Sequence, residues 1–168
     1  MKDQVVVSGV QMSTKWLNKE ENLNLIKGSI EKVKKEENAD LIVFPELSNC
    51  GYIKDRDKVF GRQFTKMADT VPGFFTDEIG KQAKKHGVYV IVGLVKLHPE
   101  IPATLYNAAV LIDPKGEIVG VQHKMHIPGY EKHYFIGGTN CEPFKTDIGN
   151  IGISICFDGQ FPEYTRTL

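Results

Sequence analysis

Three side chains in this sequence have the chemical types that acyl transfer requires. Cys156 carries a thiol, Glu46 a carboxylate and Lys124 an ammonium group. A thiol can attack a carbonyl carbon, a carboxylate can take the thiol proton, and an ammonium group can stabilise the oxyanion that develops. Each residue alone has a simpler interpretation: a glutamate that pairs with a surface lysine, a solvated lysine, and a buried unreactive cysteine. Their occurrence together favours the chemical interpretation.

The segments around these residues support this hypothesis. Glu46 follows an apolar run that ends in proline, where partial desolvation makes a carboxylate a better base near neutral pH. Cys156 follows the apolar segment 152–155 and precedes a turn, where neighbouring backbone N–H groups can bind an oxygen. Glu131 lies seven residues after Lys124, beyond a Pro-Gly turn that can bring its carboxylate back to the ammonium group.

The hydrophobic pattern predicts the elements that must position these side chains. Apolar, β-branched runs predict buried strands, and apolar residues at spacings of three and four predict amphipathic helices. We expect strands at 5–12, 40–44, 88–95, 105–112, 117–122 and 148–155, helices at 18–37, at 76–86 and from 161, and a less regular segment at 48–73. This order indicates one mixed α/β domain over residues 1–168, with helices packed on a sheet. Glu46, Lys124 and Cys156 each end a predicted strand, so we expect a shared sheet edge to bring them together.

The composition limits the expected partners and compartment. Lys and Arg together number 21, as do Asp and Glu, so no cationic surface for nucleic acid or anionic lipid is expected. No apolar run is long enough for a membrane span, and no secretory signal is apparent. Cys50, Cys141 and Cys156 are an odd number of cysteines in a chain without an export signal. We therefore expect free thiols in a reducing compartment, and a cytoplasmic protein.

Four segments resemble the motifs of the nitrilase superfamily of amidases, nitrilases and carbamoyl hydrolases. They occur in the family's order and together extend over essentially the whole chain, which makes the resemblance far more specific than any one of them. The segments are Asp40-Leu41-Ile42-Val43-Phe44-Pro45-Glu46 with Gly51-Tyr52; Tyr106-Asn107 through Asp113-Pro114-Lys115-Gly116 to Lys124-Met125-His126-Ile127-Pro128; Glu131-Lys132-His133-Tyr134-Phe135 with Gly137-Gly138; and Gly152-Ile153-Ser154-Ile155-Cys156-Phe157-Asp158 with Phe161-Pro162-Glu163 and Arg166.

The resemblance implies a fold, a substrate class and a mechanism. The fold is a four-layer αββα sandwich, usually assembled into a homodimer or larger homo-oligomer, and it needs no metal ion and no organic cofactor. The substrate is a small linear amide or N-carbamoyl amine, cleaved through a thioester with release of ammonia or an amine. Glu46 is then the general base and Cys156 the nucleophile, while Lys124 and the backbone N–H of Phe157 stabilise the oxyanion.

Two further side chains have supporting roles by the same resemblance. Glu131 positions Lys124 and contacts the substrate nitrogen, and Tyr52 supports the substrate site. The chain departs from the family in length, because it ends at Leu168, twelve residues after Cys156. We therefore expect the N-terminal part of the domain, incomplete at its C-terminal side, with apolar sheet surface uncovered and little hydrolase activity from these residues alone.

The sequence is also compatible with other interpretations, to different degrees. An inactive remnant or interaction module of the same fold stays open, as does a member that hydrolyses nitriles. A nucleotide-binding α/β domain is disfavoured because no glycine-rich loop opens a helix after the first strand. A metal hydrolase is disfavoured because His123 and His126 lie three residues apart without a further His or Cys cluster.

Overall fold

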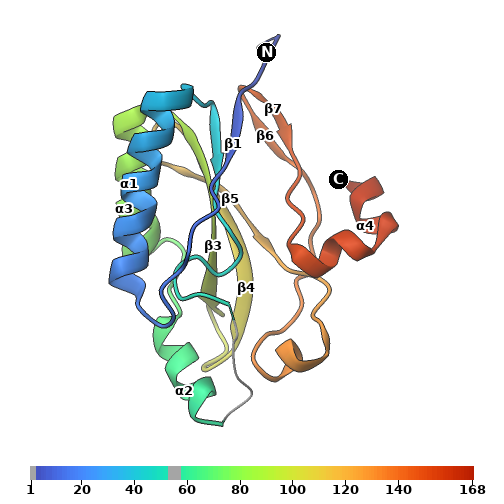
Figure 1. The fold of residues 1–168 in the computed structure, drawn as a ribbon. Helices are drawn as coiled ribbons and strands as arrows, with labels where there is room; N and C mark the ends of the chain where they lie inside the picture. Colours follow the sequence, from blue (N-terminus) through green and yellow to red (C-terminus); the bar gives the residue numbers. More distant parts are fainter. Residues whose placement is uncertain (1–2, 53–57) are drawn as a thin grey trace.

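The computed structural model describes residues 3–52 and 58–168. Helices α1 and α3 cover one face of a five-stranded sheet, and β6, β7 and α4 lie beyond the other face (Figure 1). No helix within the described ranges is long and apolar enough to cross a membrane. The elements are β1 (Val7–Gly9), α1 (Lys19–Glu37), β2 (Leu41–Val43), α2 (Lys58–Met67), α3 (Phe74–His86), β3 (Tyr89–Leu97), β4 (Leu105–Ile112), β5 (Ile118–His123), the 3₁₀ helix η1 (Gly129–His133), β6 (Phe144–Thr146), β7 (Gly149–Ile151), the 3₁₀ helix η2 (Cys156–Gln160) and α4 (Pro162–Thr167).

The main sheet is mixed, with the strand order β1-β2-β3-β4-β5. The pairs β1–β2 and β2–β3 are parallel, and the pairs β3–β4 and β4–β5 are antiparallel. Parallel neighbours need a crossover, so helices separate the first three strands, whereas β4 and β5 are joined by the short turn at 113–116. The mixed α/β fold predicted from the hydrophobic pattern is confirmed.

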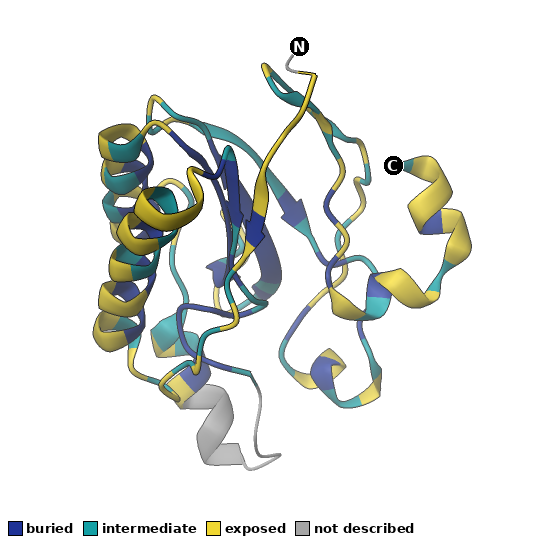
Figure 2. Ribbon diagram, turned by 45° about the horizontal axis from the view of Figure 1, so that its top comes forward, coloured by how far each residue is buried: buried dark blue, intermediate teal, exposed yellow. Residues whose placement is uncertain are grey.

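The sheet face under α1 and α3 carries the larger hydrophobic core. In α1, Leu23, Ile26 and Ile30 recur at spacings of three and four, and all three are buried. They pack with α3 against alternate residues of β3, among them Val90 and Val92. Figure 2 shows the result, a buried sheet interior behind helices whose outer faces are exposed.

The helix ends follow local capping signals. The Asn18 side chain accepts a hydrogen bond from the backbone N–H of Glu21 at 3.1 Å, which starts α1 where the sequence predicted. Helix α3 begins at Phe74, two residues before the predicted start, and ends before Gly87, whose φ of 60° suits glycine.

The strand predicted at 148–155 is wrong in extent and in partner. The ladder covers only Gly149–Ile151 and pairs with β6 in a separate two-stranded sheet. Beyond it, Ile153 and Ile155 still alternate as buried residues, and they pack on the main sheet without belonging to it. The alternation of side chains therefore reflects packing between layers and not a longer ladder.

The segment predicted to be less regular, 48–73, contains a helix. Helix α2 spans Lys58–Met67. Its Phe64 is fully buried and packs against Leu47 and Cys50, which follow β2. The part of that segment at 53–57 lies outside the described residues. The strands predicted at 5–12 and 40–44 are also shorter than expected, at Val7–Gly9 and Leu41–Val43.

Gly93 allows the turn that carries Glu46 to lie directly on β3. A Cβ at position 93 would meet three backbone atoms, Pro45 O at 2.5 Å, Glu46 Cα at 2.8 Å and Leu47 N at 2.8 Å. Backbone at this distance cannot move aside as a flexible side chain can. The missing side chain of Gly93 therefore sets the height of Glu46 above the sheet.

Replacing this glycine should destabilise the protein through overpacking. Gly93→Ala is expected to lower the free energy of unfolding by about 1–3 kcal/mol, measured by urea denaturation. The matched control is Gly28→Ala in the middle of α1, where a Cβ has no neighbour within 4 Å. That control should raise stability by about 0.5–1 kcal/mol, and equal effects of the two substitutions would contradict the packing argument.

Candidate active site

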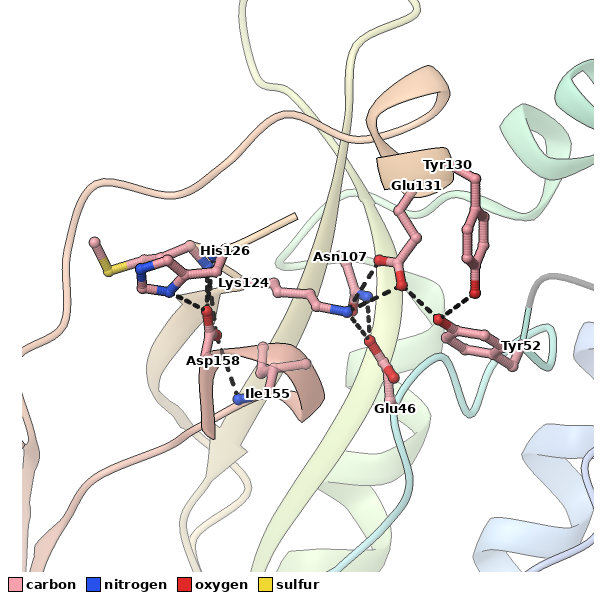
Figure 3. Close-up of polar contacts among 10 residues, drawn as sticks. Glu46, Tyr52, Asn107, Lys124, His126, Tyr130, Glu131, Ile155 and Asp158 are labelled. Atoms are coloured by element: carbon pink, nitrogen blue, oxygen red, sulfur yellow. Dashed lines mark hydrogen bonds and ion pairs between the residues drawn. The ribbon is translucent and has the colours of Figure 1, made fainter. Parts of the chain in front are cut away.

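Lys124 is the centre of a buried polar cluster at the end of β5. Its side chain is fully buried. Its Nζ lies 2.7 Å from Glu46 Oε1, and 3.1 Å and 3.0 Å from Glu131 Oε1 and Oε2. Figure 3 shows the ammonium group between the two carboxylates. The structure thus brings together three of the predicted site residues from three separate segments.

The two carboxylates keep Lys124 charged. Burial alone lowers the pKa of a lysine, because water no longer solvates the ammonium form. Here the hydrogen bonds and negative charges of Glu46 and Glu131 outweigh burial, and the pKa of Lys124 is raised above its usual value. The ammonium form therefore persists at neutral pH.

Glu46 lies in the turn that follows β2, and one of its oxygens is fully engaged. Its Oε1 accepts hydrogen bonds from Lys124 Nζ at 2.7 Å and from Asn107 Nδ2 at 2.6 Å. The next residue, Leu47, has a φ of 53°, a left-handed conformation that costs a residue other than glycine about 1–2 kcal/mol. Oε2 is the oxygen left for a further partner.

Glu131 is held from the side opposite to Lys124. It is fully buried in η1, and its Oε1 accepts a hydrogen bond from the Tyr52 hydroxyl. The Tyr52 hydroxyl also lies 2.9 Å from the Tyr130 hydroxyl, which donates because the Tyr52 proton is already used. Burial and then these hydrogen bonds raise the pKa of Tyr52, which stays a neutral phenol. Tyr52 therefore lies beside Glu131 and holds its carboxylate by a hydrogen bond. The contact of Glu131 with a substrate nitrogen stays a prediction.

Cys156 approaches this cluster from the other layer, so the predicted shared sheet edge is wrong. It opens η2, is exposed, and lines with Glu46 a cavity of about 300 Å³ between the main sheet and the segment 151–156. Its φ of 48° is again left-handed. The backbone N–H of Phe157 lies in the first turn of η2, where helical N–H groups have no partner within the helix.

The environment of the Cys156 thiol opposes spontaneous ionisation. Partial burial and then the negative charge of Glu46 raise the pKa of Cys156, and the charge of Lys124 only partly offsets them. The thiol form thus dominates at neutral pH, and a neighbouring base is needed to remove its proton.

Asp158 ties the segment after Lys124 to the segment that carries Cys156. The Asp158 carboxylate is fully buried and accepts from the backbone N–H of His126 at 2.7 Å and of Met125 at 3.2 Å. It also accepts from the backbone N–H of Ile155 at 3.4 Å and lies 2.9 Å from His126 Nδ1. One carboxylate therefore fixes the spacing of two loops that belong to different layers.

Asn107 and Asp158 were missed as site residues by the sequence analysis. Asn107 is a polar residue inside the apolar run of β4, and Asp158 is a charged residue directly after the Cys156 segment. A polar residue buried in either setting needs a hydrogen-bond partner. The presence of Asn107 within an apolar strand, and of Asp158 beside Cys156, could therefore have marked both as site residues.

The histidines considered for a metal site have other neighbours. Among residues 3–52 and 58–168, no group of three or more His, Cys, Asp or Glu side chains is arranged to hold a metal ion. His123 stacks on Tyr106 with ring centroids 4.0 Å apart, and His126 stacks on Phe161 at 3.8 Å.

Comparisons with known proteins agree on one family. A family model described as carbon-nitrogen hydrolase matches residues 6–168. A nitrilase of Pyrococcus abyssi is 33% identical over 167 residues, which are 98% of this chain and 60% of the relative. An N-carbamoylputrescine amidase of Solanum lycopersicum is 31% identical over 139 residues, 79% of this chain and 44% of the relative.

A solved structure gives the same result for the fold. The crystal structure of a carbon–nitrogen hydrolase from Helicobacter pylori G27 matches with a TM-score of 0.81 and 26% identity, over 96% of this chain and 55% of that one. The chain thus spans between 44% and 60% of the lengths of these three proteins.

The burial of Lys124 predicts that this residue supports the stability of the protein. Lys124→Met removes the cation between Glu46 and Glu131 and should lower the free energy of unfolding at pH 7 by about 3–5 kcal/mol. Because the pKa of Lys124 is raised in the folded state, its contribution is fully present below the ordinary lysine pKa, and the deficit should narrow only as the pH rises above that value. Denaturant unfolding at several pH values measures both effects.

Lys81→Met is the matched control for this measurement. Lys81 pairs with Glu78 at the surface and its side chain is 69% exposed. Its replacement should change stability little, because Lys81 is at the surface and Glu78 keeps its ion pair with Lys27 at 2.9 Å. A Lys124→Met variant as stable as Lys81→Met would contradict the buried-charge argument.

Proposed function

The chain belongs to the carbon–nitrogen hydrolase family, and from that premise we propose that it hydrolyses non-peptide carbon–nitrogen bonds in small linear amides or N-carbamoyl amines. The observation that carries this proposal is the Lys124 ammonium group held between Glu131 and Glu46, while Glu46 and Cys156 line the same cavity. Nucleophile, base and oxyanion partner are thereby close together in a site partly shielded from water.

The proposed reaction begins with proton transfer from the thiol. Glu46 takes the Cys156 proton as the sulfur attacks the carbonyl carbon, and the carbonyl oxygen becomes an oxyanion. Lys124 Nζ and the Phe157 backbone N–H stabilise this oxyanion. When the intermediate collapses, the carbon–nitrogen bond breaks and the nitrogen takes the proton back from Glu46. Ammonia or an amine leaves, and a thioester on Cys156 stays behind.

The second half of the cycle releases the acid. Glu46 takes a proton from water, and the resulting hydroxide attacks the thioester carbon. The tetrahedral intermediate then expels the sulfur, which recovers its proton from Glu46. The cycle uses protein groups and water alone, and each proton that Glu46 accepts is returned in the following step.

Proton transfer to Glu46 also frees Lys124 for the oxyanion. In the resting site the ammonium group has three donors, and each meets a carboxylate oxygen within 3.1 Å. A protonated Glu46 attracts an ammonium group less than an ionised one does. The Lys124–Glu46 bond therefore weakens at the moment when negative charge develops on the substrate oxygen.

Nitrile hydrolysis is a second candidate for the same site. The Pyrococcus abyssi relative named above is a nitrilase, and a thiol can add to a nitrile carbon as it does to an amide carbon. We favour amides and carbamoyl compounds because the Lys124 and Phe157 donors suit an oxygen anion. By family resemblance we also propose a homodimer or larger homo-oligomer as the working assembly.

A substrate panel tests the activity. Ammonia release from purified protein should be measured with linear amides, N-carbamoyl amines and nitriles, and the first two classes are expected to react faster. Cys156→Ala should lose on the order of a thousandfold or more in rate. Cys141→Ala is the matched control and should keep wild-type turnover. Unchanged turnover in Cys156→Ala would reject the proposal.

Thiol alkylation tests the role of the base separately. Iodoacetamide should modify Cys156 before Cys141 and Cys50, since Cys50 is buried and burial raises the pKa of its thiol. Glu46→Gln should slow modification of Cys156 by on the order of a hundredfold. Cys141 in the same molecules should react at an unchanged rate, and peptide mass spectrometry follows both sites at once. Equal slowing at both cysteines would point to a general structural change and against Glu46 as the base.

A further inference from the structure

We propose that Asn107 is a positioning residue that determines which oxygen of Glu46 accepts and returns the proton, an inference that rests on the proposed function. Asn107 lies on β4 and is 1% exposed. Its Nδ2 donates to Glu46 Oε1 at 2.6 Å, and its backbone oxygen accepts from the Lys124 N–H at 2.8 Å. The residue thus holds the base through its side chain, as Figure 3 shows, and the lysine through its backbone.

The neutral amide holds Glu46 in both of its protonation states. The attraction between Lys124 and Glu46 depends on the charge of the carboxylate and weakens when Glu46 takes a proton. The Asn107 N–H bonds to Oε1 whether or not the carboxyl group is charged. With Oε1 occupied, the proton goes to Oε2, the oxygen left for Cys156 and for the leaving nitrogen. Asn107 therefore keeps the proton on the reactive side through the whole cycle.

The other end of the Asn107 amide points to the same conclusion. Its Oδ1 is buried and has no hydrogen-bond partner among the described residues. A buried unpaired acceptor is unfavourable, and an apolar side chain of similar size would avoid that cost. Turning the amide over would place Oδ1 against Glu46 Oε1, two acceptors in contact, so the orientation with Nδ2 toward Glu46 is the stable one. Over the described part of the chain, the bond to Glu46 is the side-chain hydrogen bond of Asn107 that offsets the unpaired oxygen.

The test measures the pH dependence of Cys156 alkylation by iodoacetamide in wild type, Asn107→Ala and Asn107→Asp. The titratable groups around Glu46 are Lys124, Glu131, Tyr52 and Cys156, and all of them are unchanged in these variants. The backbone bond from Asn107 to Lys124 also survives substitution. Asn107→Ala therefore isolates the side-chain contact, and Asn107→Asp replaces the amide donor by a second carboxyl group.

The acid limb of the rate profile should move to higher pH in a defined order. Glu46 must be ionised to take the thiol proton, and a hydrogen bond to the ionised form favours it. Asn107→Ala removes that bond and its stabilisation of the ionised carboxylate, so alkylation on the acid side should slow by about ten- to a hundredfold. Asn107→Asp should shift the limb further, because two adjacent carboxyl groups cannot both ionise easily. The isosteric Asn107→Asp variant also keeps the test valid if Asn107→Ala loses stability through its cavity.

Asn22→Ala is the matched control for a purely structural role. Asn22 is also fully buried, but within residues 3–52 and 58–168 its side chain bonds to backbone alone, to Lys15 N at 2.6 Å, Lys15 O at 2.7 Å and Asn49 O at 3.2 Å. Asn22→Ala should lower the melting temperature and leave the position of the acid limb unchanged. In a Glu46→Gln background, Asn107→Ala should have no further effect on the profile.

The outcomes separate this inference from the proposed function. Superposable profiles for wild type, Asn107→Ala and Asn107→Asp would overturn the role of Asn107, even if the protein hydrolyses amides. Conversely, the ordered shift without hydrolysis of any substrate class would support Asn107 and reject the hydrolase proposal. Where an amide is hydrolysed, kcat should fall in Asn107→Ala with KM within about twofold of wild type, because this side chain does not touch substrate.

Discussion

A buried cation is the constraint on which the rest of the site depends. Lys124 is fully enclosed, and an isolated charge in such a place would cost far more than a small domain can offset. Glu46 and Glu131 neutralise it, but together they leave the cluster with one excess negative charge. Neutral donors from Asn107 and Tyr52 disperse that excess without cancelling it. The cluster is therefore stable while it still contains a carboxylate able to accept a proton.

Cys156, the proposed nucleophile, belongs to a different layer from this charged cluster, and the separation suits the proposed reaction. Glu46, Lys124 and Glu131 stay hydrogen-bonded to one another on the main sheet, whereas Cys156 faces them across a cavity. The cavity between the layers thus lies beside the ion pairs and is not filled by them. Asp158 maintains the distance, since its carboxylate receives backbone N–H groups from both sides.

Much of this arrangement could be predicted from the sequence, and the exceptions have a common cause. The helix at 18–37 and the mixed sheet follow from periodicity, which is local, and the motifs around Glu46, Lys124 and Glu131 mark residues that the structure brings together. The predicted placement of Cys156 at the edge of the main sheet was wrong. Alternating buried residues such as Ile153 and Ile155 occur both in a hydrogen-bonded strand and in a segment that only packs on a sheet. Asn107 was missed because its contact with Glu46 depends on how β3 and β4 align beside the turn after β2. No local pattern encodes such a register.

The left-handed backbone at Cys156 limits the kinds of nucleophile that this scaffold can present. Its φ of 48° places Cβ close to the following carbonyl, and a side chain with a single substituent on Cβ can tolerate this position. A second substituent on the same carbon makes the conformation a true outlier. Serine therefore fits the same backbone, but threonine does not. An oxygen nucleophile at this position must therefore be the primary alcohol of serine. The secondary alcohol of threonine is excluded by the backbone conformation, whatever its reactivity.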